Sequence, residues 1–290
     1  MEHLLQQITQ AAQRNHWNLF GYSVMNSRGE QQTIHPVHTS ACCNCYSIAK
    51  LFTLTALGFL FDDGLLHWNE RIVDIFPDSL SSHEHSHWKD VTIDHVVRHR
   101  IGFDEGFLDI DTEDIFSYPS DDFLRLVFSR RLPFAPNTQR TYSDAAYYLL
   151  SRVVTQKTGE SLDTFLMRRL FYPLRIREAA WSKCPRGYTI GATGLYLRTE
   201  DVVKLGHLYE NNGRWNGQPL LSSHFVSHAV QNRYEWMPLK ENNVMGKRGM
   251  NGQMLLFSPK HHISVAWHSI APADIQRELL RLTMENLPSC

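Results

Sequence analysis

One long, almost wholly apolar stretch constrains the fold of this chain more than any other feature. It covers residues 46–61, and Lys50 is its only charged residue. Asp62, Asp63 and Gly64 follow directly and end it. The stretch is too short to span a bilayer, for which a helix needs about 20 apolar residues. It therefore predicts a helix that is buried on all sides.

The composition is that of a globular protein. The chain has 290 residues, of which 42% are hydrophobic, so it can bury a large core. Its 29 basic and 30 acidic residues nearly cancel. This balance does not favour nucleic acid or a polybasic membrane-surface role, so we expect a small-molecule partner. No oligomeric state is indicated.

The N-terminus and the cysteines indicate the compartment. The first residues lack the basic start and apolar run of a secretory signal, and no apolar run has transmembrane length. The chain has five cysteines, an odd number, with Cys42, Cys43 and Cys45 crowded together. This pattern fits a reducing compartment better than a disulfide framework, and no second pair stands at zinc-ligand spacing. We therefore expect a cytoplasmic protein without membrane association or a metal site here.

Strand patterns lie at both ends of the chain, and helical patterns lie between them. Alternating or strand-like stretches occupy residues 19–25, 31–37, 245–250, 253–258 and 262–268. Helical patterns occupy residues 1–15, 145–158 and 273–284, and a capped helix begins near Thr199. We expect the two ends of the chain to share one sheet, with the helical segment as a second lobe. A cleft between such lobes is a usual ligand site.

Ser47 and Lys50 stand three residues apart at the start of the apolar stretch. On a helix this spacing places both side chains on one face, and N-terminal amides favour developing negative charge. A lysine in such a helix must find polar partners or lose its proton. The pair can be a nucleophile with its activator. Equally, Ser47 can cap the helix while the ammonium of Lys50 reaches water.

A polar, histidine-rich stretch before residue 90 holds two competing patterns. Ser86 and Lys89 repeat the Ser-x-x-Lys spacing, but nothing around them would bury or activate them. His83, Glu84 and His87 fit the His-Glu-x-x-His pattern of zinc peptidases, which requires a well-formed helix. The neighbouring residues are typical of a loop, and no third ligand is obvious. A zinc peptidase is therefore our third hypothesis.

Two later segments complete a pattern with Ser47 and Lys50. Residues 142–144 (Tyr-Ser-Asp) lead into a predicted helix, and residues 247–249 (Lys-Arg-Gly) lie on a predicted strand. In this order the three segments resemble the Ser-x-x-Lys, Tyr-x-Asn and Lys-Thr-Gly elements of the serine β-lactamase and penicillin-binding-protein superfamily. The match is best to the class C β-lactamase-like branch, which also contains esterases and D-amino-acid peptidases. Residues 91–102 resemble a connecting segment of that branch.

The resemblance implies a fold and a division of the chain. The fold is α/β (α+β) and β-lactamase/transpeptidase-like: N- and C-terminal segments form an antiparallel sheet flanked by helices, and a helical lobe is added. Residues 1–64 and 190–290 would form the sheet lobe. Residues 65–189 would form the inserted helical lobe of a single catalytic unit.

The resemblance also implies a mechanism. Ser47 would attack a carbonyl carbon. Tyr142, as a phenolate or through its hydrogen bond to Lys50, would act as general base and then as general acid to the leaving group. The oxyanion would lie between the backbone amides of Ser47 and Met250. Gly249 would let its strand approach the substrate closely. No cofactor and no metal are implied.

Three residues at the predicted site bear on the substrate. Asp144 stands where asparagine is usual, and it can pair with Lys50 or receive a substrate N–H or ammonium. Lys247 favours a substrate carboxylate. Arg248 replaces the usual threonine and points either off the far face of the sheet or into the cleft.

We therefore predict a serine hydrolase that cleaves a small ester or amide through an acyl-enzyme. Its substrate is a carboxylic ester, a D-amino-acid peptide or a β-lactam, with or without a carboxylate. The alternative is a penicillin-binding or sensor module that β-lactams acylate with little turnover.

Overall fold

The structure is a computed structural model and describes residues 1–79, 87–239 and 241–288. The chain forms two compact units. Unit 1 consists of Met1–Ile48, Leu174–Ala180 and Tyr196–Cys290. Unit 2 consists of Ala49–Pro173 and Trp181–Leu195. His83 and Glu84 of the predicted zinc pattern lie outside the described residues.

A six-stranded antiparallel sheet forms the centre of unit 1, in the order β2-β1-β11-β10-β9-β8. Its strands are β1 (Leu19–Asn26), β2 (Gln31–Ile34), β8 (Met237–Leu239), β9 (Glu241–Arg248), β10 (Met254–Ser258) and β11 (Ile263–Ser269). Because β1 pairs with β11, the two ends of the chain share one sheet, as predicted. The second predicted strand is shorter than expected and ends at Ile34, and the strand expected over 245–250 ends at Arg248.

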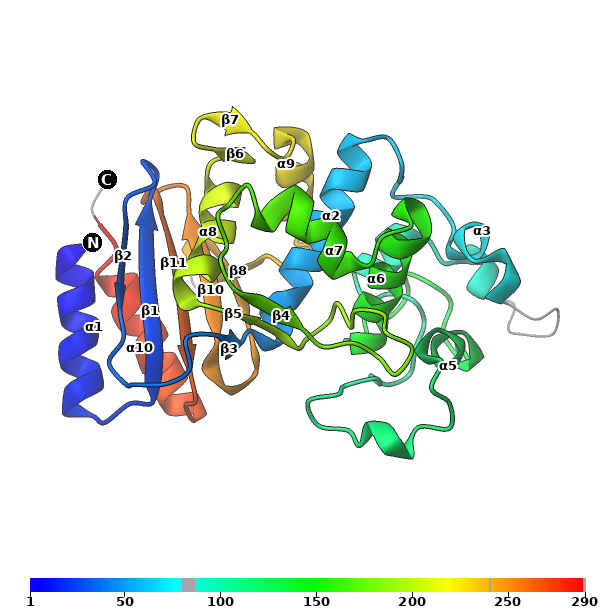
Figure 1. Cartoon of the computed structure of the whole chain (residues 1–290), viewed down its shortest axis with the longest axis horizontal. Coiled ribbons are helices and arrows are strands. Elements are labelled where there is room, and N and C mark those ends of the chain that lie inside the picture. The colour runs from blue at the N-terminus through cyan, green and yellow to red at the C-terminus, as the bar shows by residue number, and fades with distance from the viewer. Residues whose placement is uncertain (80–86, 240, 289–290) are drawn as a thin grey trace. The chain divides into compact units, whose positions relative to one another are not determined.

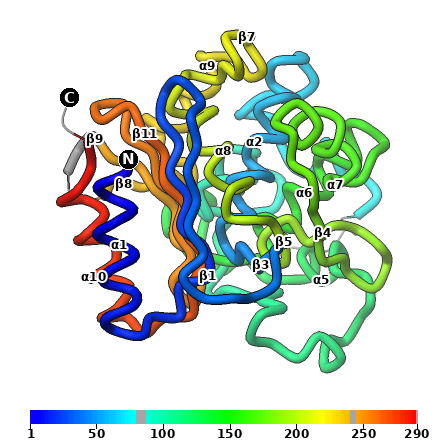
Figure 2. The backbone as a smooth tube through the Cα atoms, turned by 60° about the vertical axis from the view of Figure 1, so that its left-hand side comes forward, coloured from blue at the N-terminus to red at the C-terminus, as the bar shows by residue number. Residues whose placement is uncertain are grey.

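Helices cover the sheet of unit 1. Helices α1 (Glu2–Arg14) and α10 (Ala273–Glu285) lie side by side on one face, and α8 (Thr199–Glu210) packs on the other (Figures 1 and 2). Leu4, Ile8 and Leu279 bury the amphipathic faces of α1 and α10 against strand residues such as Val24 and Trp267. This burial of apolar area is the main stabilising contribution of the two terminal helices.

Short elements complete unit 1. They are the strands β3 (Cys43–Asn44), β4 (Ala179–Trp181) and β5 (Leu195–Leu197), the hairpin of β6 (Arg214–Trp215) and β7 (Gln218–Pro219), helix α9 (Ser223–Gln231), and the 3₁₀ turns η1 (Tyr46–Ile48) and η6 (Met250–Gly252). Strands β4 and β5 continue into unit 2. The predicted cap at Thr199 is absent: Thr199 is already helical, and its hydroxyl lies 2.8 Å from His268 Nδ1.

Unit 2 is built around helix α2 (Ala49–Asp62), which is buried from Ala49 to Leu60. Helices α6 (Asp144–Thr158) and α7 (Leu162–Leu166) pack against it. Shorter helices surround them: α3 (Ile72–Ile75), α4 (Ile93–Val97), α5 (Phe123–Ser129), the 3₁₀ turns η2 (Pro77–Ser79), η3 (Trp88–Asp90) and η4 (Ile115–Ser117), and the π-helical η5 (Met167–Phe171). No helix in the described ranges is long and apolar enough to cross a membrane.

The two units divide the chain differently from the predicted lobes. Residues 49–64 belong with the helices rather than the sheet, because α2 packs against α6 and α7. Residues 190–195 join them, since their carbonyls accept hydrogen bonds from Thr53 and Lys50. Residues 174–180 join unit 1, where they bond to α8 and the residue before it.

Candidate active site

Ser47 lies in the 3₁₀ turn η1, directly before α2. The predicted helix over 46–61 therefore begins as a tighter turn. Tyr46 has a left-handed backbone, with φ of 46°, and its N–H donates to Asn44 Oδ1 at 2.9 Å. Its hydroxyl accepts from Asn251 Nδ2 at 3.0 Å. These bonds hold a strained turn that leaves Ser47 partly exposed one turn before Lys50.

Lys50 is completely buried in unit 2. Its ammonium donates to Asp144 Oδ1 at 2.7 Å and to the carbonyl of Ala192 at 2.9 Å. The same Nζ lies 4.8 Å from the ring centroid of Tyr142 and 5.9 Å from that of Tyr147. The interpretation in which the ammonium of Lys50 reaches water is therefore wrong. Lys50 instead satisfies its charge inside the protein, as a buried cation must.

Tyr142 and Asp144 are positioned by a neighbouring loop. Ser143 Oγ accepts from the N–H of Phe107 at 3.2 Å, and the carbonyl of Phe107 accepts from Ala145 at 3.1 Å. A Cβ on Gly106 would lie 2.5 Å from the carbonyl oxygen of Tyr142, so only glycine fits there. Asp144 then begins α6, where the helix N-terminus favours its carboxylate, and Tyr142 stays 39% exposed.

His99 also contacts the segment that carries Tyr142, and its sequence context had not marked it as a site residue. Its Nδ1 accepts from the N–H of Ser143 at 3.3 Å, and its ring centroid lies 4.5 Å from that of Tyr142. His99 falls within the 91–102 stretch that resembles the class C branch, so that resemblance was a usable signal. Its contacts make it a support for the Tyr142 ring.

Three carboxylates gather beside Lys50 in unit 2. One oxygen each of Asp109, Asp111 and Asp144 lies within 4.8 Å of the others. The hydroxyl of Thr193 donates to Asp111, and burial raises the pKa of that carboxyl. Asp144 carries the ammonium of Lys50, so the first of its two predicted roles is the one observed.

Lys247 lies near the end of β9 in unit 1. It is buried, and its ammonium forms an ion pair with Glu235, which is also buried. Glu235 follows α9 and has a left-handed backbone, with φ of 58°. Nothing in the sequence pattern pointed to Glu235. Lys247, which we expect to favour a substrate carboxylate, thus already has a carboxylate partner within the protein.

The end of β9 approaches the turn that carries Ser47. A Cβ on Gly249 would lie 2.7 Å from the carbonyl oxygen of Cys45, and β9 packs against η1. We expected Met250 to end the strand, but it begins the 3₁₀ turn η6. Arg248 takes the first of its two predicted orientations: it lines a pocket with Arg277, Leu280 and Met284 of α10, on the far face of the sheet.

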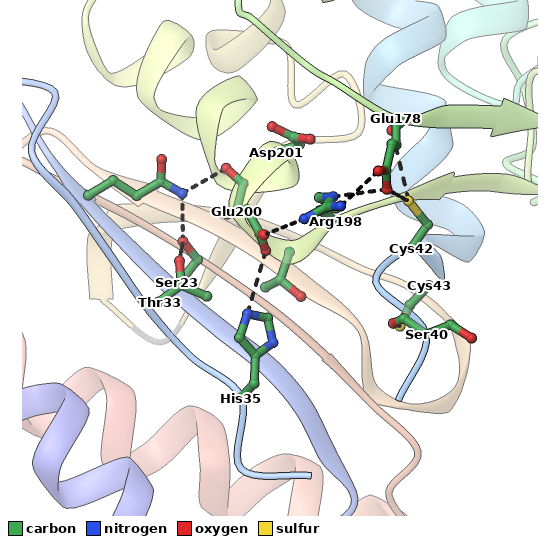
Figure 3. Close-up of polar contacts among 12 residues, drawn as sticks. Ser23, Thr33, His35, Ser40, Cys42, Cys43, Glu178, Arg198, Glu200 and Asp201 are labelled. Atoms are coloured by element: carbon green, nitrogen blue, oxygen red, sulfur yellow. Dashed lines mark hydrogen bonds and ion pairs between the residues drawn. The ribbon is translucent and has the colours of Figure 1, made fainter. Parts of the chain in front are cut away.

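The three crowded cysteines face different partners. Figure 3 shows the thiol of Cys42 beside Glu178, with Sγ 3.5 Å from Oε2, and Glu178 paired with Arg198. Cys43 contacts the carbonyl of Ser40 at 3.7 Å. Cys45 is buried 3.6 Å from His268 Nε2, and burial lowers the pKa of this imidazole to about 4, so the ring is neutral at pH 7. The three thiols do not converge on one point.

A family model described as beta-lactamase matches residues 10–277. The chain belongs to the beta-lactamase family. It thereby joins a superfamily of serine hydrolases, and its β-lactamase/transpeptidase-like fold with an antiparallel sheet is confirmed.

This chain is similar to the following three proteins in sequence or in fold. Penicillin-binding protein 4 of Amycolatopsis lactamdurans is 30% identical over 149 residues, which are 49% of this chain and 37% of that protein. A protein of Bacillus anthracis assigned as a 6-aminohexanoate-dimer hydrolase has a TM-score of 0.80 at 15% identity, covering 96% of this chain and 80% of that one. A family VIII carboxylesterase has a TM-score of 0.76 at 13% identity, covering 98% and 96%. The chain spans about a third of the length of the curated relatives it matches.

Proposed function

We propose that this chain is a serine hydrolase that cleaves a small ester or amide through an acyl-enzyme on Ser47. The observation that carries the proposal is the buried ammonium of Lys50, 4.8 Å from the ring centroid of the partly exposed Tyr142. Lys50 stands one turn after Ser47 along the chain. A nucleophilic serine needs such an activating partner because its free hydroxyl is a weak nucleophile.

In the proposed acylation step, Ser47 Oγ bonds to the carbonyl carbon and its proton passes to Tyr142. Tyr142 then gives the proton to the leaving alcohol or amine as the bond to that group breaks. In deacylation, Tyr142 takes a proton from water as the water oxygen bonds to the acyl carbon. The bond from that carbon to Ser47 Oγ then breaks, Tyr142 returns the proton to Oγ, and the carboxylic acid leaves. The fixed ammonium of Lys50 stabilises the phenolate form of Tyr142, which accepts the proton in each step.

We assign the proposed oxyanion hole to the backbone N–H groups of Ser47 and Met250. Support comes from unit 1 alone, where Gly249 permits β9 to approach the Cys45 carbonyl and so brings the following residue to the Ser47 turn. Preorganised donors of this kind typically contribute about 100- to 1,000-fold in rate.

Covalent labelling tests the proposal. We expect a fluorophosphonate probe to add one adduct per chain by intact mass, mapped by peptide sequencing to Ser47, and to block hydrolysis of p-nitrophenyl butyrate. A Ser86→Ala protein, altered in the other Ser-x-x-Lys match, should label normally. A fluorescent penicillin that stays bound without turnover would favour the penicillin-binding module instead. Activity lost to a chelator, with no adduct on Ser47, would favour the zinc peptidase.

Replacing Tyr142 with phenylalanine removes the proposed general base and keeps the ring. We expect kcat/KM for p-nitrophenyl butyrate to fall by about 100- to 10,000-fold. Because the ring is partly exposed, the thermal midpoint should change little. Tyr172→Phe, at an exposed tyrosine of unit 2, is the matched control and should retain full activity. A Tyr142→Phe enzyme with more than a tenth of the wild-type kcat/KM would contradict this role.

A further inference from the structure

The ion pair of Lys247 and Glu235 bears on which substrates the proposed site accepts. Both side chains are buried in unit 1, with Lys247 9% and Glu235 4% exposed. The ammonium donates directly to Glu235 Oε2. Glu235 adopts its uncommon left-handed backbone at this position, with φ of 58°. A strained backbone that delivers a carboxylate to a buried lysine suggests a functional arrangement.

A paired lysine recognises a substrate carboxylate poorly. The pair has no net charge, so a second carboxylate nearby gains from the ammonium about what it loses to Glu235. The substrate carboxylate would also lose its own hydration on entering a buried position. Recognition of a carboxylate by Lys247 therefore requires that Glu235 be displaced or neutralised.

Lys247 is near enough to the proposed nucleophile for its charge state to matter. Its strand packs against η1, the turn that contains Ser47, and Gly249 reaches the backbone of Cys45. These contacts all lie within unit 1. An acyl group on Ser47 would therefore lie in the electrostatic field of the Lys247–Glu235 pair.

The charged residues of unit 2 are an independent observation that also bears on a substrate carboxylate. The ammonium of Lys50 is bound by Asp144, and Asp109 and Asp111 bring two further carboxylates to this group. A second cation, Arg140, has its guanidinium carbon 5.7 Å from the ring centroid of Tyr142, so three aspartates face two cations. This group therefore also disfavours a substrate anion.

On the basis of the function proposed above, we propose that Glu235 is a specificity-determining residue that restricts the enzyme to acyl groups without a carboxylate. It does so by neutralising Lys247. The substrate class is then a carboxylic ester or amide whose acyl part is uncharged. A β-lactam, whose carboxylate lies next to the scissile ring, belongs to the disfavoured class.

A matched pair of esters tests the proposal. p-Nitrophenyl hexanoate and mono-p-nitrophenyl adipate have the same acyl length and differ in a terminal carboxylate. We expect the wild-type enzyme to prefer hexanoate by at least about tenfold in kcat/KM, and Glu235→Gln to reduce this preference by about tenfold. The ratio of the two values is independent of how much of a preparation is active, so partial unfolding does not affect it.

Two further variants complete the experiment. Glu210→Gln changes another buried glutamate of unit 1, one that pairs with His262, and should leave the ratio unchanged. If Glu235→Gln does not fold, the double variant Lys247→Met with Glu235→Leu replaces the pair by apolar side chains, a change that buried ion pairs often tolerate. It should keep the wild-type ratio within about threefold, because the pair it removes has no net charge.

The outcomes separate this inference from the proposed function. Hydrolysis of both esters through Ser47, with adipate preferred, would overturn the inference alone. A double variant that shifts the preference tenfold or more toward hexanoate would also overturn it, because Lys247 would then have been serving the carboxylate. A protein that hydrolyses neither ester and does not label on Ser47 would instead overturn the proposed function.

Discussion

Replacing Ser47 with alanine is expected to lower kcat/KM for p-nitrophenyl butyrate by about 10,000-fold or more. The reason is that Ser47 carries the acyl group in the proposed mechanism, and loss of a serine nucleophile typically removes all covalent catalysis. The change removes one oxygen from a partly exposed side chain, so folding should be nearly unaffected. Hydrolysis assays together with a thermal melt provide the measurement.

Ser40→Ala is the matched control for this variant, since Ser40 is exposed and lies a few residues earlier in unit 1. It should retain wild-type activity and labelling. A Ser47→Ala protein that still turns over the ester at more than a hundredth of the wild-type rate, while Ser40→Ala behaves normally, would rule out the acyl-enzyme on Ser47.

Replacing Lys50 with methionine should damage both activity and stability. The carboxylate of Asp144 would lose a buried partner at 2.7 Å, and breaking a buried ion pair typically costs about 3–5 kcal/mol. Activity should fall by at least about 1,000-fold, because Ser47 and Tyr142 both lose their activating charge. Urea unfolding gives the free energy, and ester hydrolysis gives the rate.

A second variant separates the structural and catalytic effects of Lys50. Combining Lys50→Met with Asp144→Leu removes both charges and should recover most of the lost stability, since apolar replacements of buried ion pairs are often neutral. It should recover none of the activity. A stable double variant that hydrolyses the ester at a rate near that of the wild type would show that Lys50 only stabilises the fold.

The elements of this protein could be predicted largely from local patterns. Period-2 and helical patterns placed β1, β10, β11, α1 and α10 within a few residues, because the amphipathic faces of these elements alternate with the period of the structure. The limits of β2 and β9 were less accurate, since strand ends depend on pairing partners. For β9, the pairing with β10 ends where Arg248 lies opposite Met254.

The chain by itself determined a buried helix with a single lysine, because an apolar stretch of that length has no other stable location. It also supplied the three motifs whose order and spacing indicated the family. The sequence could not determine which groups accept hydrogen bonds from the ammonium of Lys50. The partners, Asp144 and the carbonyl of Ala192, lie 94 and 142 residues away in the sequence.

Only the tertiary structure decided which charged side chains lie beside the motif residues and how they pair. Glu235 reaches Lys247 through a left-handed backbone at a position without any motif, and no local pattern marks such a residue. Arg248 points to the far face because neighbouring residues of a strand alternate, and burial of Lys247 settled which of the two lies inward. Local periodicity thus determined the elements, whereas the pairing of buried charges depended on contacts that only the folded chain makes.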